Sequence, residues 1–206
     1  MDGNERFRKG LRLDRDLKLS GNDNVAKEHP MAVIFSGIDP RTPSEIVFDL
    51  GLGDIYSIRM AGNVLGPNVI GSMEYGCVVG GAKLILVMGH TNSGLVQFAM
   101  NRAREKSDVS KWLGCPNLGP ILDQIQESLN IEECQNLNAN PDQLKTLVDE
   151  TSRRNIAKVV RQIVDRSPAI SQLIEERRVA IVGSLFDVDT GNVELLLDQS
   201  IGINAS

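Results

Sequence analysis

Two short, nearly continuous apolar runs constrain the fold of this chain more than any other feature. Met31–Ser36 reads MAVIFS and Lys83–Met88 reads KLILVM, and a glycine-containing loop follows each run. Apolar runs of this length, without polar alternation, are typical of parallel strands that are buried on both faces of a sheet. Parallel neighbours must be joined by long crossover connections, which are usually helices. The two runs therefore predict an α/β fold.

The segments between and after these runs supply the remaining parts of such a fold. Asp54–Arg59 alternates apolar and polar residues and predicts a third strand. Thr42–Glu45 has the form of a capping box with proline at the first helical position, and predicts a short helix that ends by Gly51. Asn68–Gly80 has helical spacing, with Cys77 on its apolar face. We expect a mainly parallel central sheet flanked by helices, with right-handed crossovers.

The second half of the chain is helical by its pattern and then returns to strand. Residues 177–200 are predicted to form a C-terminal strand hairpin, in which Arg178–Val182 and Val193–Leu197 are joined through Gly191. Amphipathic periodicity predicts four helices before the hairpin: Leu95–Arg104, Ile121–Leu129, Asp142–Val164 and Ala169–Glu176.

Length and composition indicate one domain. The chain has 206 residues, 41% of them apolar and 24% charged, with a formal charge of -5, so nucleic acid is not an expected partner. No apolar run reaches the length of a membrane span, and the polar start is no signal peptide, so a cytoplasmic location is expected. We expect a single domain over residues 1–206, with an N-terminal helical arm (1–28) and a helical insert (104–176).

Several segments resemble those of the β-class carbonic anhydrases, in the same order along the chain. Ser36–Glu45 (SGIDPRTPSE), followed by Arg59–Asn63 (RMAGN), is similar to the family's Cys-x-Asp-x-Arg segment and its Arg-x-Ala-Gly-Asn turn. Gly89–Gly94 (GHTNSG) is similar to the family's Gly-His-x-x-Cys-Gly. Gly3–Phe7 (GNERF) and Asp189–Gly191 (DTG) resemble its N-terminal segment and its C-terminal hairpin. The resemblance covers essentially the whole chain and implies the family's fold.

The resemblance also identifies where this chain departs from the family. Zinc is held there by two cysteines and one histidine, whose positions here are Gly37, Ser93 and His90. Only the histidine remains. Glycine offers no side-chain donor, and a neutral serine hydroxyl is a poor substitute for a thiolate. Because zinc supplies the nucleophile by lowering the pKa of its bound water, we expect no zinc cofactor and no hydration chemistry.

The family's aspartate and arginine, by contrast, are retained as Asp39 and Arg41, a vestigial catalytic dyad. One hypothesis is that the pair only fixes the loop, which Pro40 stiffens by removing a backbone N–H. The other is that Arg41, with Gly62 and Asn63, still holds a small anion such as bicarbonate. His90 is expected to be a buried, hydrogen-bonded histidine, and Cys77 a core residue instead of a relocated metal ligand.

These departures favour a carbonic-anhydrase-like domain that has lost zinc and catalysis and has a regulatory, bicarbonate-sensing or assembly role. The phrasing around Asp39 is closest to the domains fused to SulP-type anion transporters, so the membrane part of such a transporter is a candidate partner, with a location at the cytoplasmic face. The resemblance implies a homodimer or higher homo-oligomer. An active carbonate dehydratase with an unconventional metal site is the alternative. A hydrolase or nucleotide binder lacks its motifs, because no G-x-S-x-G or P-loop sequence is present.

Overall fold

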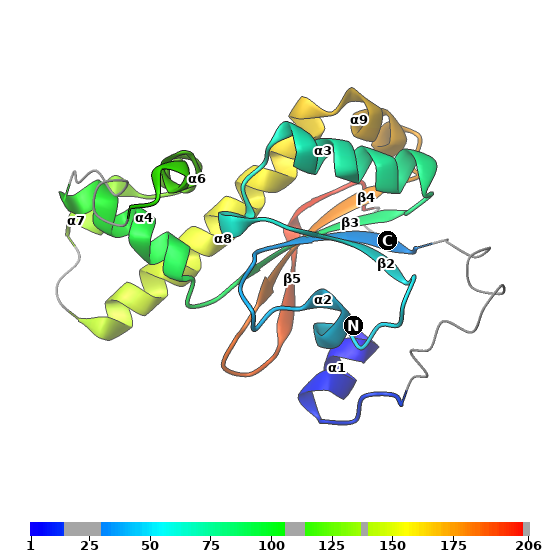
Figure 1. Cartoon of the computed structure of the whole chain (residues 1–206), viewed down its shortest axis with the longest axis horizontal. Helices are drawn as coiled ribbons and strands as arrows, with labels where there is room; N and C mark the ends of the chain where they lie inside the picture. Colours follow the sequence, from blue (N-terminus) through cyan, green and yellow to red (C-terminus); the bar gives the residue numbers. More distant parts are fainter. Residues whose placement is uncertain (15–29, 106–113, 137–139, 204–206) are drawn as a thin grey trace.

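The computed structural model describes residues 1–14, 30–105, 114–136 and 140–203. Its centre is a five-stranded sheet in the order β2-β1-β3-β4-β5 (Figure 1). Neighbouring strands are parallel from β2 to β4, and β5 is antiparallel to β4. The strands are β1 (Ala32–Ser36), β2 (Ile55–Arg59), β3 (Leu84–His90), β4 (Ala180–Phe186) and β5 (Val193–Ile201). The predicted α/β fold with a mainly parallel sheet is therefore confirmed.

Helices cover both faces of the sheet. α3, α8 and α9 pack on one face, α1 and α2 lie on the other, and α4, α6 and α7 form a helical lobe beside the N-terminal part of α8 (Figure 1). Short turns of other types connect them, including a π-helical turn directly after α3. The bounds are α1 (Asp2–Arg8), α2 (Ser44–Val47), α3 (Pro67–Glu74), α4 (Gly94–Glu105), α6 (Gly119–Gln126), α7 (Ile131–Gln135), α8 (Pro141–Arg166) and α9 (Pro168–Glu175), with the turns Ala61–Asn63, Tyr75–Val79 and Pro116–Leu118.

The main core lies between the sheet and α3, α8 and α9. Inward side chains of alternate strand residues, among them Val33 and Phe35, meet apolar residues of the three helices there. Ile156 of α8 packs where Gly89 and Gly183 leave the sheet without side chains, because a Cβ at either glycine would approach Ile156 to 2.7 and 2.9 Å respectively. These two glycines let α8 lie close to β3 and β4. A second apolar cluster fills the helical lobe.

Two local predictions differ from the structure. Thr42–Glu45 forms no capping box: α2 begins at Ser44, and the Thr42 hydroxyl donates to the Asp39 carbonyl at 3.0 Å. The helix predicted over Asn68–Gly80 ends as regular α-helix at Glu74 and continues as the π-helical turn. That turn places Gly76 and Gly80 over the ring of Tyr56. A Cβ at Gly76 would lie 3.1 Å from a ring carbon, and a Cβ at Gly80 would lie 2.4 Å from the hydroxyl oxygen. The two glycines therefore leave room for the tyrosine.

The N-terminal arm is helical only over Asp2–Arg8, and residues 11–14 are not helical. The rest of the predicted arm lies outside the described residues, as do parts of the helical insert. The helix packs on its own chain: the Asn4 side chain donates to the carbonyls of Val47 (3.2 Å) and Gly191 (2.8 Å), and Arg6 pairs with buried Asp49 at 2.5 Å. Gly191 has a positive φ of 71°, as the hairpin prediction required. No helix in the described part of the chain is both long enough and apolar enough to cross a membrane.

Candidate functional site

The residues singled out in the sequence meet at the carboxyl ends of β1, β2 and β3. Ligands bind at this edge in open α/β sheets, because the loops that leave parallel strands converge there. A cleft of about 390 Å³ opens at this edge, between the sheet and the helical lobe. It is lined by Gly37, Ile38, Asp39, Pro40, Ala61, Gly62, Asn63, Gly89, His90, Ser93, Gly94, Leu95, Val96, Phe98, Leu118, Ser152, Asn155 and Ile156. Of the predicted site residues, only Arg41 does not line the cleft.

Gly37 follows β1 and faces His90. A Cβ at position 37 would lie 3.8 Å from His90 Nε2 and 3.2 Å from Asn63 Oδ1. A side chain on this residue would therefore point toward the imidazole and into the cleft. The glycine leaves an opening at the position where the family pattern has its first metal-binding thiolate.

His90, at the end of β3, has a fixed orientation. Its Nδ1 lies 2.8 Å from the carbonyl oxygen of Thr91, so Nδ1 carries a proton and donates to that carbonyl. The opposite nitrogen, Nε2, lies 3.9 Å from Asp39 Oδ2, and the histidine side chain is 11% exposed. The histidine is hydrogen-bonded, as the sequence predicted, but it is only partly buried, and its Nε2 is directed toward the cleft.

Asp39 and Arg41 form a bidentate ion pair across the tight turn at Pro40. Arg41 Nε donates to Asp39 Oδ1 at 2.8 Å and Nη2 donates to Oδ2 at 2.7 Å, while the Arg41 backbone amide also donates to Oδ1. These hydrogen bonds from Arg41 lower the pKa of Asp39 from 3.8 to about 2, against the opposing effect of burial. The carboxylate is therefore ionised and fully engaged at neutral pH.

The ion pair predicts a pH-dependent contribution to stability. Because the folded pKa of Asp39 lies below its unfolded value, the contribution is present above about pH 4 and is lost as pH falls toward 2. We expect Asp39→Asn to lower the free energy of unfolding by about 1 to 2 kcal/mol at pH 7, discounted for the exposed Arg41 guanidinium. Urea unfolding of both proteins between pH 7 and pH 2 checks this. A difference that stays constant over that range would contradict it.

Arg59, at the end of β2, is a site residue that the sequence analysis assigned no role. Its Nε donates to the Gly37 carbonyl at 2.9 Å and its Nη2 to the Asp39 carbonyl at 2.5 Å. Within the described residues it forms no ion pair. It therefore holds the loop that carries both residues and adds an uncompensated positive charge beside the cleft. The RMAGN motif was the available signal, since it places this arginine at a strand end.

Gly62 and Asn63 have positive φ angles of 71° and 50° in the turn after β2. Asn63 is buried and its Nδ2 donates to the Met88 carbonyl at 2.8 Å, which leaves Oδ1 toward Gly37. The Gly62 carbonyl accepts from Asn155 Nδ2 at 3.0 Å, a contact from α8 that the sequence did not indicate. Both residues line the cleft, and their role in anion binding remains a prediction.

Ser93 stands at the end of the loop that joins β3 to α4. Asn92, with φ of 53°, donates its backbone amide to Asp149 Oδ1 at 2.7 Å and so fixes this loop to α8. The Ser93 carbonyl accepts from the Gln97 amide at 3.1 Å, which makes Ser93 the residue that precedes the helix. Asp149 was not identified from the sequence, because nothing in an amphipathic helix pattern distinguishes one polar residue that faces a loop.

The donor set at this site does not fit a zinc ion. His90 is the one nitrogen donor, Asp39 is engaged by Arg41, and the positions of the two thiolates hold glycine and serine. In the described ranges no group of three or more His, Cys, Asp or Glu side chains could hold a metal. Cys77 lies in the main core, where burial raises the pKa of its thiol to about 11, so it supplies no ligand to the cleft.

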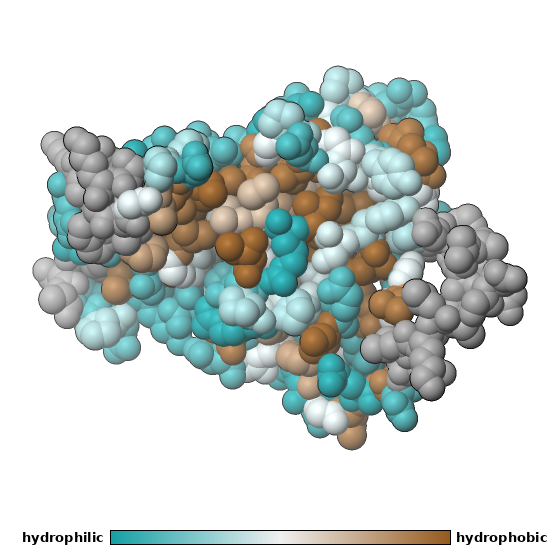
Figure 2. Space-filling model, in the orientation of Figure 1, coloured by the Kyte–Doolittle hydropathy of each residue, from teal (hydrophilic) through white to brown (hydrophobic). Residues whose placement is uncertain are grey.

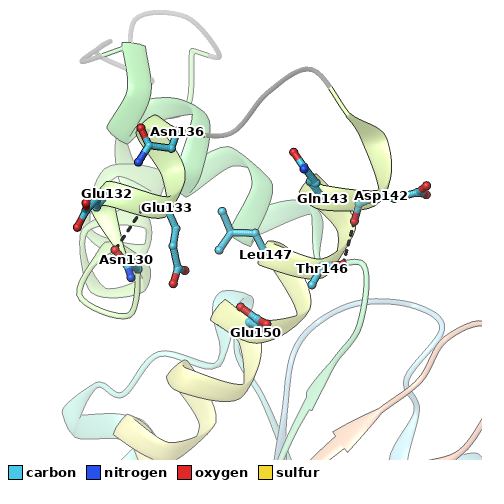
Figure 3. A pocket seen from close by; sticks show the side chains of 9 residues that line it. All are labelled: Asn130, Glu132, Glu133, Asn136, Asp142, Gln143, Thr146, Leu147 and Glu150. Carbon is cyan, nitrogen blue, oxygen red and sulfur yellow. Dashed lines mark hydrogen bonds between the residues drawn. The ribbon is translucent and has the colours of Figure 1, made fainter.

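A second hollow lies between α7 and α8 (Figure 3). Its lining is strongly acidic: Glu132, Glu133, Asp142 and Glu150 contribute carboxylates. Glu133 is bound by Arg154 at 3.3 Å. None of the residues identified from the sequence lies here, and the carboxylates disfavour anions. The smaller cleft at the strand ends is therefore the candidate site.

Comparison with known proteins assigns this arrangement a family. The family model described as carbonic anhydrase matches residues 32–193. Carbonic anhydrase 2 of Mycobacterium tuberculosis is 31% identical over 195 residues, which cover 94% of this chain and 88% of the relative. A carbonic anhydrase of Mycolicibacterium smegmatis is 31% identical with the same coverage.

Solved structures show the same fold. One of two tetrameric β-carbonic anhydrases from Sordaria macrospora superposes with a TM-score of 0.66 at 21% identity, and the match covers 84% of this chain and 83% of that one. A β-carbonic anhydrase of Coccomyxa in complex with acetazolamide gives a TM-score of 0.69 at 18% identity, covering 84% and 74% of the two chains.

Proposed function

This chain belongs to the β-carbonic anhydrase family, and from that premise we propose that it is a member without zinc and without carbon dioxide hydration, which acts as a regulatory or anion-sensing domain. One observation carries the proposal. Gly37 faces His90 Nε2 at the edge of the sheet, and a Cβ on the glycine would lie 3.8 Å from that nitrogen. Because glycine has no side chain, position 37 supplies no donor to a metal. A site with a single nitrogen donor and an engaged carboxylate does not bind zinc strongly.

The retained parts of the site support a binding role. Asp39, Arg41 and Arg59 form a connected set of hydrogen bonds around the Gly37 loop, and this set is intact although the metal-binding residues are replaced. Such a loop keeps the cleft open and its charges fixed. Bicarbonate is the anion we propose, since the family's chemistry concerns it. We further propose a cytoplasmic location, or the cytoplasmic face of a membrane beside a SulP-type anion transporter.

Self-association is part of the proposal. The Sordaria macrospora relatives are tetrameric, and this chain has large apolar side chains on its surface. Ile38, at the rim of the cleft, is 59% exposed, and apolar surface is visible between the helical lobe and α3 (Figure 2). Exposed apolar patches of this kind mark interaction surfaces. We propose a homodimer or a larger homo-oligomer.

An active carbonate dehydratase is the second candidate function. The 31% identity over 94% of the chain to proteins named carbonic anhydrase favours it. It requires a metal site built from ligands other than the family's two thiolates.

Stopped-flow measurement of carbon dioxide hydration separates the two candidates. We expect the purified chain, with and without added zinc, to give no rate above that of buffer, because no group at the site replaces the metal. The chelator-treated protein is the control. A hydration rate that zinc restores after chelation would establish the active enzyme instead.

A further inference from the structure

The N-terminus of α4 opens into the cleft with unused hydrogen-bond donors. The first three residues of this helix, Gly94, Leu95 and Val96, all line the cleft. The leading amides of a helix have no intrahelical acceptor. In the described part of the chain no carbonyl or side chain accepts from these three amides. The helix is 12 residues long, so the positive end of its dipole adds to this concentration of donors.

Ser93 is a second and independent sign of a ligand. It is only 9% exposed and lines the cleft. Its hydroxyl makes no hydrogen bond to any other described residue, and it accepts none from the amides of Leu95 or Val96, as a serine before a helix usually does. The hydroxyl oxygen itself is accessible from the cleft, so a ligand there can form a hydrogen bond with it. An unpartnered hydroxyl beside three free amides is the arrangement that an anion would complete.

The fixed charges around the cleft favour an anion with a single charge. Asp39 and Arg41 neutralise each other through their bidentate contact. Arg59 donates only to carbonyl oxygens, so its charge is not balanced within the described residues. The acceptors of the cleft, Asn63 Oδ1 and the Asp39 carboxylate, lie near Gly37 and His90. The anion therefore belongs at the α4 end of the cleft.

We infer that the cleft binds a small monovalent oxyanion at the N-terminus of α4, held by the Ser93 hydroxyl and the backbone amides of Gly94, Leu95 and Val96. This inference rests on the proposed function, in which no metal is bound at the site. The family pattern has a negatively charged, metal-bound thiolate at position 93. The bound anion supplies the negative charge that serine lacks. Bicarbonate, nitrate and acetate share the required chemistry. The dyad aspartate and arginine are not the binding groups.

The test is anion-dependent stabilisation of the intact, chelator-treated chain. Thermal unfolding is followed in sodium bicarbonate and in sodium nitrate, each against sodium chloride at the same ionic strength. We expect both oxyanions to raise the unfolding midpoint of the unmodified chain, and to shift the amide resonances of Gly94, Leu95 and Val96. Ser93→Ala should weaken binding by about fivefold or more, since it removes one hydrogen bond to a charged ligand.

Ser93→Asp gives the sharpest contrast, because it places a carboxylate where the anion would bind. This variant should unfold at a higher temperature without any oxyanion and should not respond to added oxyanion. Asn140→Asp is the matched control: it adds the same charge at the N-terminus of α8, where Asn140 already accepts from the Asp142 amide, and it should respond like the unmodified chain.

Two results would overturn the inference: an unmodified chain that does not respond to either oxyanion, or a Ser93→Asp variant that responds as strongly as the unmodified chain. If Ser93→Asp does not fold, unchanged affinity in Ser93→Ala together with unshifted Gly94–Val96 resonances overturns it equally. Zinc content and hydration are measured on the same preparations. A zinc-free, inactive chain without an oxyanion response contradicts this inference and the bicarbonate-sensing role, but not the proposed loss of zinc and hydration. Zinc-dependent hydration contradicts that loss, whatever the oxyanion response.

Discussion

Replacing both missing ligands together, Gly37→Cys with Ser93→Cys, is expected to give a chain that binds one zinc ion. A side chain at position 37 would start 3.8 Å from His90 Nε2, and Ser93 lines the same cleft, so two thiols and the imidazole would share one space. Asn63 must yield slightly, since its Oδ1 lies 3.2 Å from the new Cβ. Full zinc sites contribute about 10 to 16 kcal/mol, so zinc affinity should rise by at least about a thousandfold over the unmodified chain.

Zinc titration with a competing chelator measures this effect. Each single substitution should bind more weakly than the pair, because it leaves a thiolate missing. Gly71→Cys with Ser72→Cys is the matched control: it adds two thiols on the exposed side of α3, away from His90, and should not reproduce the gain. Equal zinc affinity in the control and the site variant would contradict the geometry. Zinc uptake without hydration would identify the loop at Pro40 as the remaining obstacle.

Ile156→Ala is expected to be the most destabilising single substitution among those considered. Ile156 is 1% exposed and packs against the backbone of β3 and β4 at Gly89 and Gly183, two residues that have no side chain of their own to fill the space. Removing its buried carbon atoms should lower the free energy of unfolding by about 2 to 5 kcal/mol. At about 2 to 4 °C per kcal/mol for a chain of this size, the melting temperature should fall by roughly 4 to 20 °C.

Two variants make this prediction specific. Ile156→Val removes one carbon and should cost about 0.5 to 1.5 kcal/mol. Leu197→Ala, on β5 at a side chain that is 61% exposed, should change stability by less than about 0.5 kcal/mol. Urea unfolding of the three variants gives the comparison. If Ile156→Ala were no more destabilising than Leu197→Ala, the close packing of α8 on the two glycines would be wrong.

The strands and long helices of this fold were predictable because their patterns are local. Buried parallel strands such as Ala32–Ser36 read as apolar runs, and α8 has a sustained helical period. The π-helical turn after α3 was not predictable, because its close contact with the ring of Tyr56 involves another element of the fold. The five-residue helix α7 was missed, since so short a helix has too few turns to show a period.

The residues of the site likewise divide into those with a local signal in the sequence and those without one. Gly37, His90 and Ser93 were identified through the resemblance to the family's motifs, which are short and contiguous in the sequence. The motifs did not identify Asp149, which reaches the Asn92 amide from α8, or the unused amides of α4, because these depend on where a helix arrives in space. Residues that act through long-range contacts carry no local signal.

The zinc content of the unmodified chain, purified without chelator and measured by elemental analysis, tests the central claim most directly. The claim is that loss of two thiolates leaves His90 and Asp39 unable to hold the metal. Fewer than about 0.1 zinc ions per chain are predicted, since a site of this kind falls below the affinity of a full ligand set by many orders of magnitude. A content near one zinc ion per chain, removable by chelator together with hydration activity, would contradict the account.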